Sequence, residues 1–179
     1  MALLVTSCGF HLRGALALPP ELHALYLDGN SPYSSLIRNI RKSLQSSHLT
    51  IVNDPKKAPV TLFIDNDNLT YSQSTIGTSK SMRNYNVTYA VTYELRNSAG
   101  QPIIAPKTVS ASQILTTVSN EEIQNSSKLQ ETKNELIQNV IALMSYQISS
   151  PDTRKKLESS LRQSQTKKIA KENNPGMGL

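Results

Sequence analysis

Few residues of the chain have the type and spacing that metal binding or catalysis requires. The three histidines, His11, His23 and His48, lie far apart and have no carboxylate at ligand spacing, so there is no zinc signature. The run Asp65–Asn68 begins like a calcium loop, but it lacks the glycine and the closing glutamate that such a loop needs. The sequence also contains no G-x-S-x-G, P-loop or G-x-G-x-x-G motif. We therefore expect no metal and no cofactor. Nothing in the sequence points to a catalyst, although these motifs do not test for a catalytic lysine or carboxylate.

Cys8 is the only cysteine in the 179 residues, so the chain cannot form an internal disulfide. Val5, Thr6 and Ser7 give an apolar residue followed by two small ones, which is the pattern of a bacterial lipoprotein cleavage site. After cleavage Cys8 would be the first residue and would carry acyl chains on its sulfur and nitrogen. Several chains make a stable anchor, whereas one chain anchors only marginally. Gly9, which is not Asp, would permit export to the outer membrane, and the alternative for the thiol is simple burial.

The apolar stretch before this cysteine is too short to be a whole signal peptide. Ala2–Val5 is shorter than the usual apolar region of about 7–15 residues, and no basic residue precedes it. We interpret residues 1–7 as the end of a lipoprotein signal whose front the sequence lacks, and residues 8–20 as a lipidated linker. No apolar run reaches 18 residues, so no membrane-spanning helix is expected.

Alternation of apolar and polar residues predicts a sheet. In the clearest strand, Asn84–Leu95, every second residue is Tyr, Val or Leu and the intervening ones are mostly Asn and Thr. Such a strand has one buried and one polar face. Asn97–Gly100 is a turn. Further extended segments are predicted over residues 22–28, 49–52, 60–71 and 103–118.

Two amphipathic helices complete the domain. Ser31 and Pro32 suit a helix start, and an apolar stripe follows at Tyr33, Leu36, Ile37, Ile40 and Leu44. A capping box at Ser119–Glu122 starts a second helix that stops at Pro151, with a stripe at Leu129, Leu136, Ile137, Val140, Met144 and Ile148. The predicted class is α+β. Over residues 21–150 we expect a two-layer sandwich, in which two helices cover one face of an antiparallel or mixed sheet of about four strands.

Most of the positive charge lies in the tail. The formal net charge is +6, and residues 151–179 hold seven Lys and Arg against three Asp and Glu, with few apolar side chains. This basic tail is predicted to be frayed helix or disordered. A nucleic-acid partner is not expected, because the tyrosines alternate with Asn and Thr instead of lying among Lys and Arg.

The block Cys8–Gly14, CGFHLRG, resembles the start of the mature chain in the LPS-assembly lipoprotein family, LptE. The order that follows is also similar: a Pro-bearing linker, a strand ending in Asp-Gly, then helix, strands and a last helix. Lys128–Glu131 reproduces the Lys-x-x-Glu that this family often has near the start of its last helix. The resemblance covers residues 8 to 149 and leaves the basic tail outside.

The resemblance implies a function. It implies an outer-membrane lipoprotein, anchored on the periplasmic side through the lipid on Cys8, that lies inside the lumen of the LptD β-barrel as a plug. Such a protein is not an enzyme; it binds lipopolysaccharide, assists its insertion into the outer leaflet and aids barrel assembly. The alternative is another lipoprotein, a pilot or scaffold with the same anchor but no lipopolysaccharide binding. For the basic tail we expect contact with anionic lipid headgroups or with the barrel's periplasmic partner domain, and the alternative is a tail that only aids solubility.

The resemblance also suggests which residues bind lipopolysaccharide. Lipid A carries phosphates that Lys and Arg can pair with through charge-assisted hydrogen bonds. Lys128 matches the lysine of Lys-x-x-Glu, and Lys80 and Arg83 precede the long strand where the family often has a basic residue. For each of these three, an ordinary solvated charge is the alternative.

Overall fold

The computed structural model describes residues 22–45, 49–74, 82–118 and 127–172 of the chain. Five strands form one sheet in the order β2-β1-β3-β4-β5. β1 (Ala24–Gly29) is parallel to both β2 (Thr50–Val52) and β3 (Val60–Ser74). β4 (Met82–Asn97) is antiparallel to β3 and to β5 (Pro102–Val118). The α+β prediction with a mixed sheet is confirmed, with one strand more than expected because the short segment at Thr50–Val52 pairs with β1.

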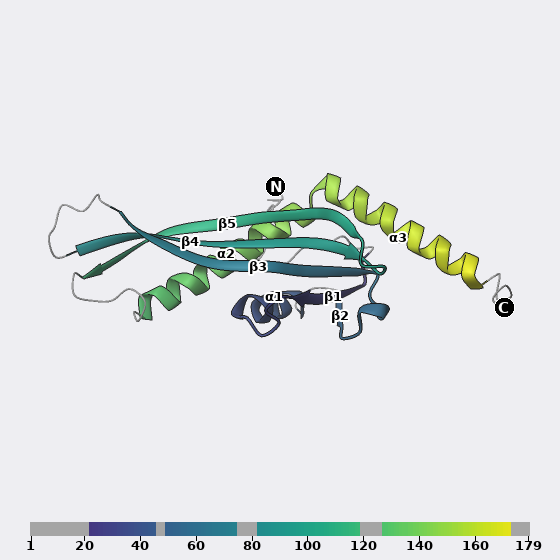
Figure 1. Ribbon diagram of the computed structural model, residues 1–179, viewed down its shortest axis with the longest axis horizontal. Coiled ribbons are helices and arrows are strands. Elements are labelled where there is room, and N and C mark those ends of the chain that lie inside the picture. Colours follow the sequence, from purple (N-terminus) through teal and green to yellow (C-terminus); the bar gives the residue numbers. More distant parts are fainter. Residues whose placement is uncertain (1–21, 46–48, 75–81, 119–126, 173–179) are drawn as a thin grey trace, which may run out of the picture.

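The helices are α1 (Ser35–Gln45), the short 3-10 helix η1 (Pro55–Lys57), α2 (Ser127–Ile148) and α3 (Pro151–Glu172). α2 crosses the sheet and contacts β4 and β5, while α1 lies over β1 and β2 (Figure 1). The two helices are joined by a hydrogen bond of 2.9 Å from the Gln138 amide of α2 to the Asn39 side chain of α1. The predicted capping box at Ser119–Glu122 lies outside the described residues. No helix in the described part of the chain is long and apolar enough to cross a membrane.

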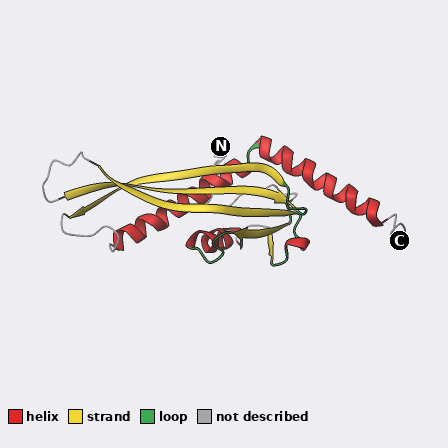
Figure 2. Cartoon of the chain, viewed as in Figure 1, coloured by secondary structure: helices red, strands yellow, loops and turns green. Residues whose placement is uncertain are grey.

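The sheet is much longer on one side than on the other. β3, β4 and β5 have 15, 16 and 17 residues, whereas β1 has six and β2 three. The three long strands therefore continue past β1 as a twisted arm (Figure 2). We call the end of this arm, where β3 and β5 end and β4 begins, the distal end. The opposite end, where β3 begins and β4 ends, is the basal end.

The core lies between the sheet and its helices. On β4 the side chains from Tyr85 to Leu95 at alternate positions are buried, as the alternation predicts. They meet the apolar stripes of α1 and α2, which are also buried. Tyr93 in this layer donates a hydrogen bond of 3.0 Å to the Gln147 side chain of α2. The buried polar end of the tyrosine is thus satisfied within the core.

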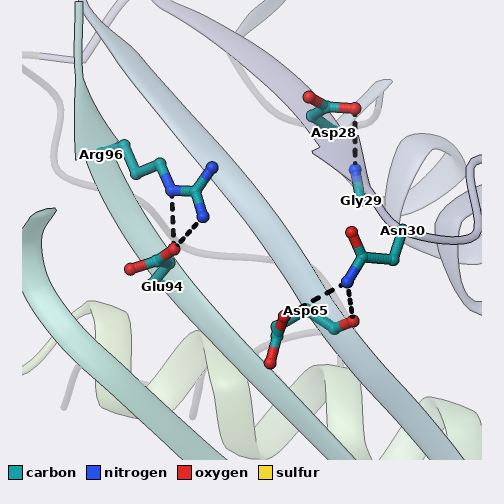
Figure 3. A network of polar contacts seen from close by, with 6 residues as sticks. All are labelled: Asp28, Gly29, Asn30, Asp65, Glu94 and Arg96. Carbon is teal, nitrogen blue, oxygen red and sulfur yellow. Dashed lines mark hydrogen bonds and ion pairs between the residues drawn. The ribbon is translucent and has the colours of Figure 1, made fainter. Parts of the chain in front are cut away.

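A β-bulge in β3 fixes where the arm begins. The register with β4 shifts between Ile64 and Asn66, next to the end of β1. There the Asn30 side chain donates to the Asp65 backbone carbonyl at 2.7 Å (Figure 3). The Asn30 N–H donates to the Ile64 carbonyl at 3.1 Å. The inserted residue lets Asp67 and Leu69 continue on the same face as Ile64. The bulge therefore keeps the helix-covered face of β3 continuous as the strand leaves β1 behind.

The basic tail, expected to be frayed helix or disordered, forms helix α3 over residues 151–172. Pro151 does stop α2, but proline also suits the first turn of a new helix, and the Ser150 hydroxyl accepts a hydrogen bond from the Thr153 N–H at 3.4 Å. Thr153 and Leu157 are buried, and Leu161 packs against the core cluster. α3 contacts β5 and α2, so it is anchored at its start, and Figure 1 shows its far part projecting from the body.

Candidate functional site

Arg83 lies at the distal end of β4, directly opposite Thr117 of β5. The next pair of this register on the same face is Tyr85 and Leu115, and both are buried. Arg83 itself is exposed. Because alternate residues share a face, Arg83 is on the helix-covered side of the sheet, next to the buried Thr117. Its guanidinium is therefore open to solvent at the edge of the apolar layer.

Lys128 is in the first described turn of α2, and its side chain is exposed while that of Leu129 is buried. Figure 1 shows that α2 begins toward the distal end of the sheet. Lys128 and Arg83 thus come from different elements but lie toward the same end of the molecule. Glu131, three residues after Lys128, is exposed as well.

Neither of these two cations is paired within the described part of the chain. The ion pairs found there join Arg96 to Glu94 and Lys156 to Asp152. The first is on β4, where the Arg96 guanidinium also lies 3.7 Å above the centre of the Phe63 ring (Figure 3 shows the Arg96–Glu94 pair). Arg83 and Lys128 are consequently available to an external anion.

Thr117 adds a feature that sequence reasoning missed. Its side-chain oxygen is buried and has no hydrogen-bond partner among the described residues. A buried hydroxyl without a partner costs about 1–3 kcal/mol, and a polar group that reached it would recover part of this. The signal was present in the sequence, because Thr117 continues the buried alternation of Val109 and Leu115. We call Arg83, Thr117 and Lys128 the distal cluster.

The remaining predicted site residues cannot be placed. Cys8 and Lys80 lie outside the described residues, so their roles remain predictions. Within the described ranges no group of three or more His, Cys, Asp or Glu side chains is arranged to hold a metal ion.

The opposite face of the arm is lined with hydroxyl and amide side chains that bond to one another. Thr88 and Ser112 hydroxyls lie 2.8 Å apart, as do those of Thr92 and Thr108. Near the distal end the Thr116 hydroxyl donates to the Asn84 side chain at 2.8 Å. These cross-strand pairs connect β4 and β5 on the face that the helices do not cover, which we call the hydroxyl face. The polar face predicted for the long strand is therefore confirmed.

The sequence of this chain was compared with protein families and with known proteins. The family model described as LptE, Lipopolysaccharide-assembly, matches residues 22–148. An LPS-assembly lipoprotein LptE from Yersinia enterocolitica is 50% identical over 58 residues, which are 32% of this chain and 28% of that protein. One from Yersinia pestis is 43% identical over 61 residues, 34% of this chain and 30% of that protein. The chain thus spans less than a third of the length of the curated relatives it matches.

The fold has a counterpart among solved structures. The solution structure of uncharacterized lipoprotein B from Nitrosomonas europaea aligns with a TM-score of 0.60 at 16% identity, over 79% of this chain and 90% of that one. At this identity the likeness concerns the fold alone. The family match, by contrast, runs from the start of the sheet to the end of α2 and takes in Arg83, Thr117 and Lys128. The chain therefore belongs to the lipopolysaccharide-assembly family LptE.

Proposed function

We propose that this protein is a lipid-anchored, non-enzymatic component of lipopolysaccharide assembly at the outer membrane. In this proposal it occupies the lumen of the LptD β-barrel, binds lipopolysaccharide, helps to insert it into the outer leaflet and aids assembly of the barrel. The observation that carries the proposal is the family match over residues 22–148, the whole of the sheet with α1 and α2.

The distal cluster supports lipopolysaccharide binding. Lipid A phosphates are anions, and Arg83 and Lys128 are exposed cations without a partner in the described part of the chain. Charge-assisted hydrogen bonds to phosphate are roughly twice as strong as neutral ones, and the guanidinium of Arg83 can make two at once. Thr117, paired with Arg83 across β4 and β5, would offer a further polar group beside the guanidinium.

The hydroxyl face supports a position inside a barrel. The lumen of an outer-membrane barrel is polar, and a surface that lies against it needs donors and acceptors more than apolar groups. On this face Thr88 and Thr92 already share hydrogen bonds with β5, which holds their side chains in place. Each hydroxyl still has a free lone pair for a barrel side chain or a bridging water. The anchor on Cys8 would keep the protein at the membrane while it is in the barrel.

The proposal is tested by expressing the chain with a full lipoprotein signal and a C-terminal tag, extracting outer membranes in mild detergent and identifying what co-purifies. We expect one large β-barrel protein in stoichiometric amount, together with lipopolysaccharide. A Cys8→Ser variant is the control, and it should be lost from the outer-membrane fraction. If the lipidated protein reaches the outer membrane but no barrel accompanies it, the proposal is wrong and a pilot or scaffold role replaces it.

A further inference from the structure

An open cleft of about 870 Å³ lies at the basal end, far along the sheet from the distal cluster. One wall is α3, with Glu158, Leu161 and Arg162. The other is formed by the entry to β1 and by η1 with the residues after it, including Lys56 and Lys57. The volume falls within the range of about 300–1,000 Å³ that is typical of small-ligand sites. The cleft exists because α3 continues past its buried anchor at Leu157 and stands opposite η1.

The charged side chains of the cleft are mainly cationic. Lys56, Lys57 and Arg162 line it against a single carboxylate, Glu158. Glu158 precedes Arg162 by four residues, a spacing at which helical side chains can pair. However, the ion pairs found in the described part of the chain join other residues, so none of the three cations is neutralised in this way. The cleft therefore carries an excess of two positive charges.

We propose that this basal cleft is a phosphate-binding site. A phosphate monoester carries about −1.5 to −2 charges at neutral pH, which matches the excess. Arg162 supplies a planar fork suited to two phosphate oxygens, and the two lysines supply point charges from the facing wall. Leu161 and Ala58 add apolar lining beside these cations, against which the carbon skeleton of a phosphorylated lipid headgroup would pack.

The phosphate can be carried by a glycolipid headgroup or be a free anion, and both would use the same three side chains. The headgroup form rests on the proposed function, whereas the free anion does not. Arg162 and the rest of α3 lie beyond residues 22–148, the part that the family model matches. The cleft is consequently distinct from the distal cluster both in position and in the elements that build it.

The test is a titration of the full chain with inorganic phosphate at constant ionic strength, followed by amide chemical shifts in NMR. We expect saturable shifts of residues in η1 and in α3 around Arg162. A K56Q/K57Q/R162Q variant should bind phosphate at least tenfold more weakly. The matched control K42Q/R154Q/K155Q removes the same number of charges from exposed positions outside the cleft, and it should stay within twofold of the unmodified protein.

The same two variants are then titrated with lipopolysaccharide and with phosphatase-treated lipopolysaccharide. If the cleft variant binds intact lipopolysaccharide more weakly but binds phosphatase-treated lipopolysaccharide normally, and the control variant binds both normally, the headgroup is the source of the phosphate. Unchanged lipid binding with lost phosphate binding identifies the free anion. If the unmodified protein binds no lipopolysaccharide yet binds phosphate through these cations, the proposed function fails and the cleft stands. The inference would be overturned if the cleft variant and the control variant lost phosphate affinity equally, or if the cleft variant bound phosphate as well as the unmodified protein.

Discussion

The hydroxyl of Tyr89 on β4 donates a hydrogen bond of 2.5 Å to a carboxylate oxygen of Asp67 on β3. The two residues are diagonal neighbours, since Tyr89 is paired with Leu69 and Asp67 with Val91. Asp67 is on this face only because the bulge at Ile64/Asn66 shifts the alternation of β3 by one residue. The bond therefore links β3, just past its bulge, to a buried tyrosine of β4 in the apolar layer.

Replacing Tyr89 by Phe should lower the free energy of unfolding by about 1–2 kcal/mol, because a buried hydrogen bond to a carboxylate is lost while the ring still packs. Tyr89→Asp should unfold the sheet, since it buries a second carboxylate beside Asp67. Urea denaturation measures both effects. Tyr33→Phe is the control, at an 88% exposed tyrosine, and it should change stability by less than about 0.5 kcal/mol. Equal effects of Tyr89→Phe and Tyr33→Phe would contradict this account.

Alkaline pH should destabilise the fold through its buried tyrosines. Burial raises the pKa of Tyr93 to about 12 from its ordinary value of 10.0, and burial followed by the Asp67 hydrogen bond raises the pKa of Tyr89 also. The unfolded chain therefore loses these protons first, so stability is complete below pH 10 and falls as the pH rises from 10 towards 12.

Tyr93→Phe should make this fall less steep. The slope is the quantity to compare, because the variant also loses the hydrogen bond to Gln147 at every pH. Denaturant midpoints collected between pH 8 and 12 give the slope, and Tyr146→Phe, at an 80% exposed position, serves as the control. An unchanged slope in Tyr93→Phe would show that this tyrosine does not titrate differently in the two states.

Gly29 ends β1 where β3 passes very close. A Cβ atom added there would lie 2.7 Å from the backbone oxygen of Ile64, the oxygen that accepts from the Asn30 N–H. Gly29→Ala should cost about 1–3 kcal/mol and should speed hydrogen exchange of the Asn30 amide. Gly100→Ala is the comparison, because φ of 76° makes it strained but nothing lies within 4 Å of the new atom. Gly100→Ala should destabilise the turn between β4 and β5 while leaving the Asn30 amide protected from hydrogen exchange.

Leu157 tests whether α3 is packed on the body. Its side chain is 1% exposed, so Leu157→Ala should cost about 2–5 kcal/mol if the helix is folded there. Leu143 on α2 is 41% exposed, and Leu143→Ala should cost distinctly less. Thermal or urea unfolding of the two variants gives the comparison. Equal, small losses would instead agree with a disordered tail.

Features that depend on local periodicity could be predicted from the sequence. The buried face of β4 follows the two-residue period of a strand, and the buried stripes of α1 and α2 follow the helical period. The α+β class follows from these two patterns. The sequence does not separate a packed α3 from a frayed or disordered tail, because only Thr153, Leu157 and Leu161 face the body, which is too narrow an apolar stripe to stand out in a polar segment. Pro151 indicates the end of one helix, but proline equally suits the first turn of the next, which is where α3 begins.

Features that depend on pairing between distant segments could not be predicted. The parallel contact of β1 with β2 and the bulge at Ile64/Asn66 leave no local pattern. Lys128 and Arg83 were singled out by resemblance, but their common location at the distal end follows from the β4–β5 register and the direction of α2. The basal cleft depends on α3 standing opposite η1, so no reading of either segment alone would reveal it.

The most direct test of the central claim is lipopolysaccharide binding by the purified protein and by Lys128→Glu. We predict that the unmodified protein binds and that the charge reversal weakens binding at least about tenfold, since one charge-assisted hydrogen bond is worth roughly 1.5–3 kcal/mol. The unfolding temperature should not change, because Lys128 is exposed and outside the buried stripe of α2. Lys42→Glu, an exposed lysine of α1, should bind like the unmodified protein. No binding by the unmodified protein, or equal weakening in both variants, would contradict the account.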